Sequence, residues 1–222
     1  MAKILFLMTA ADHWTLADGT THPTGFWAEE AVVPYETFKA AGHEVTVATP
    51  GGAVSPVDKV SLDSDEIKAA LEKATELREP IALTDVRLED YDAVYVPGGH
   101  GPMEDLAVDT DSGALLTRAV GSGMPVGVVC HGPAALLAAV KDDGTNAFAG
   151  YRVAAFTNEE ERINGFADKA KWLLQDRLTE AGLTVDARTP WAPHTVTDRN
   201  VVTGQNPASS GPLAVELLKQ IG

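Results

Sequence analysis

Short apolar runs alternate with longer amphipathic stretches along the chain. The runs are rich in Val and other strand-forming residues, which is typical of strands buried on both faces of a sheet. They are Lys3 to Met8, Glu44 to Ala48, Tyr91 to Val96, Pro125 to Val129, Arg152 to Phe156 and Leu183 to Ala187. The pattern predicts a set of buried parallel strands.

The intervening segments carry apolar residues at helical spacing. They are Phe26 to Ala41, Ser64 to Lys73, Ser112 to Ser122, Pro133 to Val140, Glu159 to Ala181 and Leu213 to Gln220. Gly42 and Gly182 follow two of these helices, and Asn158 can cap the helix that Glu159 opens. Pro34 should kink the first helix or delay its start.

This alternation predicts an α/β fold, a doubly wound and mostly parallel sheet flanked by helices in a three-layer sandwich. The chain has 222 residues, and its 45% hydrophobic content can fill a sizeable core. The Gly/Pro-rich segments Pro50 to Pro56 and Pro97 to Pro102 read as loops after strands. We therefore expect residues 1–222 to form a single domain.

Charge and composition limit which partners we expect the protein to bind and in which cell compartment we expect it. The 32 acidic and 17 basic side chains give a net charge of -15, which repels phosphate backbones and anionic lipid surfaces. We expect neither nucleic acid nor membrane as a partner, since no run reaches the roughly 18 apolar residues of a membrane span. A single cysteine cannot form an internal disulfide, which favours the cytoplasm.

A cysteine follows one strand at the sheet edge where α/β proteins bind ligands. Pro125 to Val129 runs directly into Cys130, His131 and Gly132. A sharp turn would lift the side chain of Cys130 above the sheet, and the positive end of the next helix would lower the pKa of its thiol. Gly127 and Gly132 leave room for a strained backbone there. The alternative is a buried, inert cysteine.

A second loop after a strand, Val96 to Pro102, is rich in glycine. The N–H groups of Gly98 and Gly99, together with the amide of His131, would form an oxyanion hole. Neither of the two glycine-rich phosphate-binding motifs is present. A plain tight turn is the alternative, and His100 by itself reads as a loop histidine.

Glu29 and Glu30 form an acidic pair at the start of the first predicted helix. Such residues often only complement the helix dipole. The apolar neighbours of Glu30, among them Trp27, would raise the pKa of its carboxyl towards a useful acid/base value near the thiol. No C-x-x-C or H-x-x-x-H spacing occurs, so we expect no metal site.

Three motifs, in this order, resemble the PfpI/ThiJ superfamily: Thr24 to Glu30, Val96 to Gly101 and Val129 to Pro133. The resemblance continues through Phe156 to Glu161 and Val202 to Ser210, and covers nearly the whole chain. It implies a flavodoxin-like fold of the class I glutamine amidotransferase type. The full pattern is similar to the branch of glutathione-independent glyoxalases (glyoxalase III, D-lactate dehydratase) and heat-inducible chaperones.

The resemblance also implies residue roles. Cys130 is the nucleophile, Glu30 is the acid/base that contacts its sulfur, and His131 belongs to a Cys-His-acid arrangement. The acid maps to the run of glutamates at 159–161, where the offset favours Glu161 and leaves Glu159 as the alternative. The other two glutamates of this run are explained as solvated residues at the start of a helix. The amides of Gly99 and His131 carry over as the oxyanion hole.

The implied reaction converts methylglyoxal and related 2-oxoaldehydes to 2-hydroxy acids such as D-lactate, without a cofactor, in a homodimer. The thiolate of Cys130 would attack the aldehyde to give a hemithioacetal. Glu30 or His131 would move the proton from C1 to C2 through an enediol-like state. Hydrolysis of the resulting thioester would release lactate.

Other functions remain open. The PfpI name suggests a cysteine peptidase that takes its acid from a neighbouring subunit in a higher oligomer. A stress chaperone, a redox sensor in which Cys130 becomes a sulfinic acid, and a deglycase of proteins or nucleotides are further alternatives. Glutamine amidotransfer is disfavoured because no His-x-Glu pair follows, His194 being succeeded by Thr195 and Val196.

Overall fold

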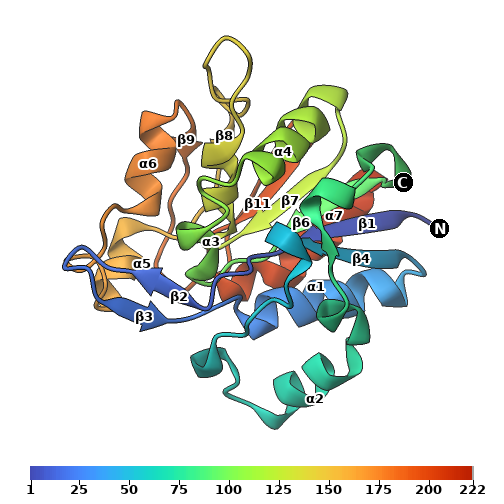
Figure 1. Ribbon diagram of the computed structural model, residues 1–222, viewed down its shortest axis with the longest axis horizontal. Coiled ribbons are helices and arrows are strands. Elements are labelled where there is room, and N and C mark those ends of the chain that lie inside the picture. The colour runs from blue at the N-terminus through green and yellow to red at the C-terminus, as the bar shows by residue number, and fades with distance from the viewer. Residues whose placement is uncertain (222) are drawn as a thin grey trace.

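A seven-stranded sheet forms the centre of the computed structural model, which describes residues 1–221 (Figure 1). The strand order is β10-β11-β7-β6-β1-β4-β5, and all neighbours are parallel except the pair β10 and β11. The strands are β1 (Lys3–Leu7), β4 (Glu44–Thr49), β5 (Ile81–Ala82), β6 (Ala93–Val96), β7 (Val126–Val129), β10 (Thr195–Asp198) and β11 (Val201–Gly204).

Helices cover both faces of this sheet, which confirms the predicted three-layer α/β fold. On one face, α1 (Ala28–Ala40) and α7 (Ser210–Ile221) pack against each other (Figure 1). On the other face lies α4 (Thr110–Ser122), next to the short helix α3 (Gly101–Glu104). Outside these layers, α2 (Asp65–Lys73) packs on α1.

Two predicted strands lie outside the main sheet. β8 (Arg152–Val153) and β9 (Thr184–Val185) pair with each other in a separate parallel pair. Directly after β8, the N–H of Ala154 donates to the side-chain Oγ1 of Thr203 on β11 and not to a strand carbonyl. The place beside β7 belongs to β11, which the apolar pattern did not predict.

The long helix predicted for Glu159 to Ala181 is two helices, α5 (Asn158–Ile163) and α6 (Leu174–Glu180). The N-cap of α5 is Thr157 rather than Asn158, because Thr157 and Glu160 form a reciprocal capping box. The residues after Cys130 form a 3₁₀ helix in place of the predicted α-helix. The 3₁₀ helices are Pro50–Gly52, Lys59–Ser61, Thr75–Arg78, Leu83–Asp85, Leu88–Asp90, Gly132–Ala138 and Pro207–Ser209.

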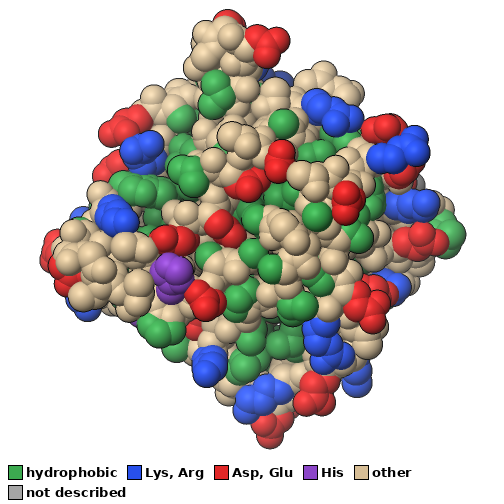
Figure 2. Space-filling view, in the orientation of Figure 1, with side chains coloured by type: hydrophobic (Ala, Val, Ile, Leu, Met, Phe, Trp, Pro, Cys, Tyr) green, Lys and Arg blue, Asp and Glu red, His purple; other side chains and the backbone are tan. Residues whose placement is uncertain are grey.

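A small hairpin of β2 (His13–Thr15) and β3 (Thr21–Pro23) lies at the edge of the molecule near α5 (Figure 1). The face drawn in Figure 2 carries acidic and basic side chains interspersed, without a continuous basic patch. Within residues 1–221 there is no helix whose length and apolar character would let it cross a membrane.

Candidate active site

Cys130 occupies the sharp turn between β7 and the 3₁₀ helix Gly132–Ala138. Its φ is 58°, a left-handed conformation that residues with a Cβ rarely adopt, so the backbone is strained. Its N–H donates to the carbonyl of Gly204 on β11, and its carbonyl accepts from the N–H of Phe156. These two bonds fix the strand-to-helix elbow that the sequence led us to expect.

The two glycines near this turn, Gly132 and Gly127, each exclude a side chain for a different reason. A Cβ on Gly132 would lie 2.6 Å from the carbonyl oxygen of Val96, so the turn can only approach β6 without a side chain there. A Cβ on Gly127 would lie 2.8 Å from the side chain of Leu217. Gly127 therefore makes room for α7, and its assignment to the strained turn was wrong.

His131 links the thiol to an acid from the same chain. Its Nδ1 lies 3.4 Å from the Sγ of Cys130, and its Nε2 lies 2.6 Å from the Oε2 of Glu161 on α5. Although burial acts to raise it, the pKa of Glu161 lies well below its usual range because His131 and His100 stabilise the carboxylate. The structure thus brings together Cys130, His131 and an ionised Glu161.

The three glutamates of α5 point in three directions, since successive helical residues are about 100° apart. Glu161 faces the histidines, and Glu159 is exposed. Glu160 is fully buried, and its Oε1 accepts from the backbone N–H of Trp191 and the side-chain amides of Gln205 and Asn206. The expectation that a solvated helix start explains both other glutamates was therefore wrong for Glu160.

Replacing Glu160 with alanine should destabilise the protein strongly. The change would leave two backbone and three side-chain donors without their carboxylate partner, in a buried site. We expect the free energy of unfolding to fall by about 3–5 kcal/mol, measured by urea denaturation. Glu159→Ala, on the exposed side of the same helix, is the matched control and should change it by less than about 0.5 kcal/mol. Similar losses in both variants would contradict the anchoring role of Glu160.

Glu30 lies fully buried on α1 and faces the thiol. Its Oε2 accepts from the N–H of Gly98 at 2.7 Å, and its carboxyl interacts with Cys130. Burial raises the pKa of Glu30 to about 8, so this carboxyl keeps its proton at neutral pH. The N–H of Gly98 is consequently occupied, and its predicted place in an oxyanion hole was wrong.

Pro34 helps to explain how α1 is anchored at Glu30. Proline has no N–H, so the carbonyl of Glu30, four residues earlier, lacks its helical partner. The hydroxyl of Tyr95 on β6 donates to this carbonyl at 2.6 Å. The helix begins at Ala28 and continues through Pro34, so the alternative of a delayed start was wrong.

The proton of Glu30 should make stability depend on pH. The folded-state pKa of about 8 exceeds the ordinary 4.5, so between these values the folded protein binds more protons than the unfolded chain and loses stability as pH rises. Relative to Glu30→Gln, we expect the parent protein to lose on the order of 3–5 kcal/mol between these pH values. Denaturation at several pH values measures it, with Glu36→Gln on the exposed side of α1 as control. A pH-independent difference between parent and Glu30→Gln would contradict the assignment.

The thiol of Cys130 lies in a closed environment. Burial and the negative charge of an ionised Glu30 raise its pKa, whereas the N–H groups of Gly99 and His131 lower it. The net shift is upward, so the expectation of a lowered thiol pKa was wrong. The helix that follows is a short 3₁₀ helix and not the expected α-helix, and the sulfur is buried away from water. While Glu30 keeps its proton, its charge is absent, and the two groups titrate as a pair.

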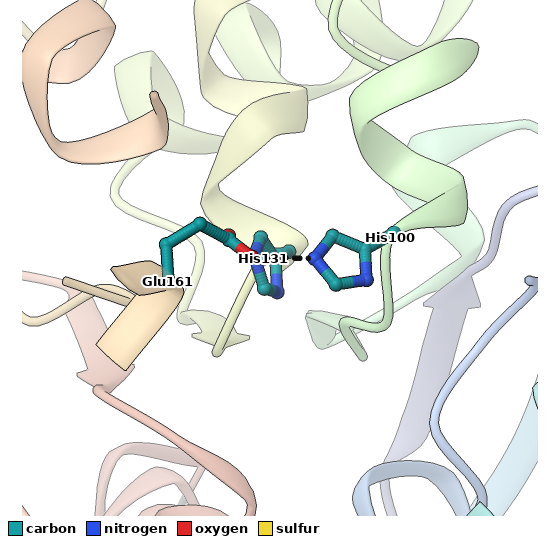
Figure 3. A group of neighbouring side chains, drawn as sticks. All are labelled: His100, His131 and Glu161. Atoms are coloured by element: carbon teal, nitrogen blue, oxygen red, sulfur yellow. Dashed lines mark hydrogen bonds and ion pairs between the residues drawn. The ribbon is translucent and has the colours of Figure 1, made fainter. Parts of the chain in front are cut away.

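His100, which the sequence presented as a loop histidine, belongs to this site. Its Nε2 lies 3.0 Å from the Oε1 of Glu161, so that Glu161 binds two imidazoles (Figure 3). Its ring stacks on Trp14 of β2 with centroids 4.5 Å apart. No local motif indicates this role, because the partners of His100, Trp14 and Glu161, lie in distant segments of the chain.

A cavity of about 40 Å³ opens onto these groups. The thiol of Cys130 and both histidines line one part, and Trp27 and Trp191 are among the aromatic residues that line the rest. Trp191 is 43% exposed and has a φ of 64°, a strained conformation held in part by Glu160. The volume corresponds to about three water-sized groups, which suits a small molecule.

The same histidines and Glu161 form a set that could ligate a divalent cation. One ligand atom from each of the three residues lies within 4.8 Å of the others, and two imidazoles with one carboxylate suit several transition metals. Nε2 of both histidines and both oxygens of Glu161 are already engaged in two hydrogen bonds. A cation bound at Nε2 of His131 would replace the bond to Glu161 and leave the ring proton on Nδ1, where it could no longer take the thiol proton.

The fold and this site define an α/β protein with a cysteine on a strand-to-helix elbow beside a histidine and an acid. The chain belongs to the DJ-1/PfpI family, whose model matches residues 22–220. The protein/nucleic acid deglycase HchA of Staphylococcus aureus (strain MSSA476) is 29% identical over 237 residues, covering 99% of this chain and 81% of the relative.

Two solved structures extend the comparison. Glyoxalase III from Candida albicans is 27% identical with a TM-score of 0.87, over 99% of this chain and 97% of that chain. The Rapid Encystment Protein 24 KDa of Francisella tularensis is 26% identical with a TM-score of 0.91, over 100% of both chains. These findings confirm the resemblance to the PfpI/ThiJ superfamily and to its glyoxalase III-like branch.

Proposed function

We propose that this protein converts methylglyoxal and related small 2-oxoaldehydes into 2-hydroxy acids such as D-lactate, without glutathione or another cofactor. The observation that carries the proposal is a cavity of about 40 Å³ in which one thiol lies beside two histidines. A three-carbon dicarbonyl suits this volume, whereas a peptide chain needs an open cleft. Similarity to glyoxalase III and to a deglycase supports an enzyme of this family.

In the first step, the sulfur of Cys130 forms a bond to the aldehyde carbon, C1. Nδ1 of His131 takes the thiol proton and returns it to the aldehyde oxygen, which gives a neutral hemithioacetal. The ionised Glu161 stabilises the transient imidazolium. The N–H groups of Gly99 and His131 face the sulfur and stabilise the negative charge that develops on it as the proton leaves.

In the second step, a base moves the hydrogen of C1 to C2 through an enediol. The C2 oxygen takes up a proton, and C1 becomes the carbonyl of a thioester. Protonated Glu30 is placed beside the sulfur as the acid of this step. Water then cleaves the thioester, releases the 2-hydroxy acid and restores the thiol, so that one water is consumed in each cycle.

Deglycation is a second candidate because the relative in S. aureus is named a protein/nucleic acid deglycase. The two activities separate when a low-molecular-weight thiol is added at fixed total methylglyoxal. Turnover of the free aldehyde predicts that the initial rate of lactate formation falls in proportion to the free aldehyde that remains. A rate that follows the adduct concentration instead would favour deglycation and contradict our proposal.

The source of the acid bears on the peptidase alternative. Glu161 reaches His131 within one chain, so the arrangement does not need an acid from a neighbouring subunit. We propose a homodimer in the cytoplasm, which is supported by the resemblance and by the single free cysteine. Light scattering after size-exclusion chromatography tests the dimer, and a higher oligomer would favour the peptidase reading.

A further inference from the structure

Glu161 fixes the tautomers of two histidines at once. Its two oxygens accept hydrogen bonds from Nε2 of His131 and Nε2 of His100 (Figure 3). Because an ionised carboxylate can only accept, each Nε2 carries the proton and each Nδ1 of a neutral ring keeps a lone pair. Nδ1 of His131 faces the sulfur of Cys130.

His100 has the same tautomer but no such partner. Figure 3 shows its second ring nitrogen on the side of the ring away from Glu161, and within residues 1–221 this Nδ1 makes no hydrogen bond. The ring lines the same cavity as Cys130 and is held in place by stacking on Trp14. An oriented ring with a free lone pair therefore borders the space where the substrate would bind.

The proposed reaction needs a base that is free after the thiol has reacted. Glu30 still holds its proton below a pH of about 8, its pKa being raised by burial. In the hemithioacetal, Nδ1 of His131 has returned its proton and accepts a hydrogen bond from the new hydroxyl at C1, so its lone pair is engaged at that oxygen. The pKa of His100 is lowered by burial and by the charge of His131, whose ring centroid is 4.2 Å away, so His100 stays neutral and able to accept.

We propose that His100 is the catalytic base that moves the hydrogen of the hemithioacetal from C1 to C2, a role that rests on the proposed function. Nδ1 takes the C1 hydrogen as a proton, and the electron pair of that bond forms the C1–C2 double bond of the enediol. The C2 oxygen is protonated by Glu30. Nδ1 then returns its proton to C2, and the hydroxyl proton of C1 goes back to Glu30 as the thioester carbonyl forms.

The small cavity supports this assignment. In about 40 Å³, a three-carbon substrate bound to the sulfur must place C1 and C2 against the lining side chains. His100 and Cys130 both belong to that lining. Among the ring nitrogens of that lining, Nδ1 of His100 has a lone pair that is engaged neither with Glu161 nor with the oxygen at C1.

Two substitutions separate a base from a residue that only holds Glu161. His100→Gln keeps an N–H donor where Nε2 stands but has no basic nitrogen, whereas His100→Phe loses both. We expect kcat for methylglyoxal to fall by at least about 100-fold in both variants. The rate at which iodoacetamide alkylates Cys130 should stay within about threefold of the parent in His100→Gln, because His131 keeps its place.

His22→Gln is the matched control, since this ring contacts His100 edge-on and lies outside the cavity lining. It should keep the parent kcat. Near-parent turnover in His100→Gln would overturn the base assignment, and so would a parallel loss of turnover and alkylation, which would show a positioning role. A parent protein without turnover would overturn the proposed function itself, and this role with it.

Discussion

Cys130→Ala is expected to reduce lactate formation from methylglyoxal to the uncatalysed background, a loss of at least about 10⁴-fold in kcat. In the proposed mechanism the sulfur of Cys130 bonds to the substrate, and this chain has no second cysteine to replace it. The assay is the initial rate of lactate production by the purified variant. Circular dichroism should show an unchanged fold, because alanine fits the buried turn.

Cys130→Ser sharpens this test. Serine preserves the size of the side chain and the strained turn at φ 58°, but its hydroxyl is a far weaker nucleophile than a thiol. It should be as inactive as the alanine variant. Retention of lactate formation by either variant would contradict the role of Cys130 as the nucleophile.

Glu161→Gln should lower kcat by about 10³–10⁴-fold while leaving the fold intact. The carboxylate accepts from two Nε2–H groups, but an amide offers one oxygen and one NH₂ group. One histidine would then have to accept at Nε2 and move its proton to Nδ1, where it could no longer act as a base. Steady-state kinetics with methylglyoxal measures the loss.

Glu159→Gln is the matched control for this change, since its side chain is exposed on the same helix. It should retain the parent kcat. A loss of less than about tenfold in Glu161→Gln would show that the tautomers of the two histidines do not depend on this carboxylate, and would contradict the mechanism.

The sequence predicted the sheet well where a strand is apolar over its whole length, as in β1, β6 and β7. It failed at Arg152 to Phe156, where an equally apolar run forms only a two-residue strand. These residues are buried partly because they support the elbow: the N–H of Phe156 bonds to Cys130, and its ring lies 4.3 Å from that of His131. Hydrophobic periodicity shows that a segment is buried, but it cannot distinguish a strand of the sheet from a segment that is buried because it supports the elbow.

The candidate site was predictable where its residues sit in local motifs. Cys130, His131 and Glu30 follow a strand or open a helix, and the offset to the acid selected Glu161. His100 could not be assigned in this way because its role depends on contacts with segments far away in the sequence. Burial decides the upward direction of the thiol pKa, and no local pattern shows how closed a site will be.

The most direct test of the account is whether the purified protein forms lactate from methylglyoxal in the absence of glutathione. Proton NMR can follow the reaction, and a stereospecific lactate dehydrogenase can identify the enantiomer. We expect catalytic production of D-lactate by the parent protein and background levels with Cys130→Ala. No lactate from the parent protein, under conditions where it is folded and its cysteine is reduced, would contradict the proposed function.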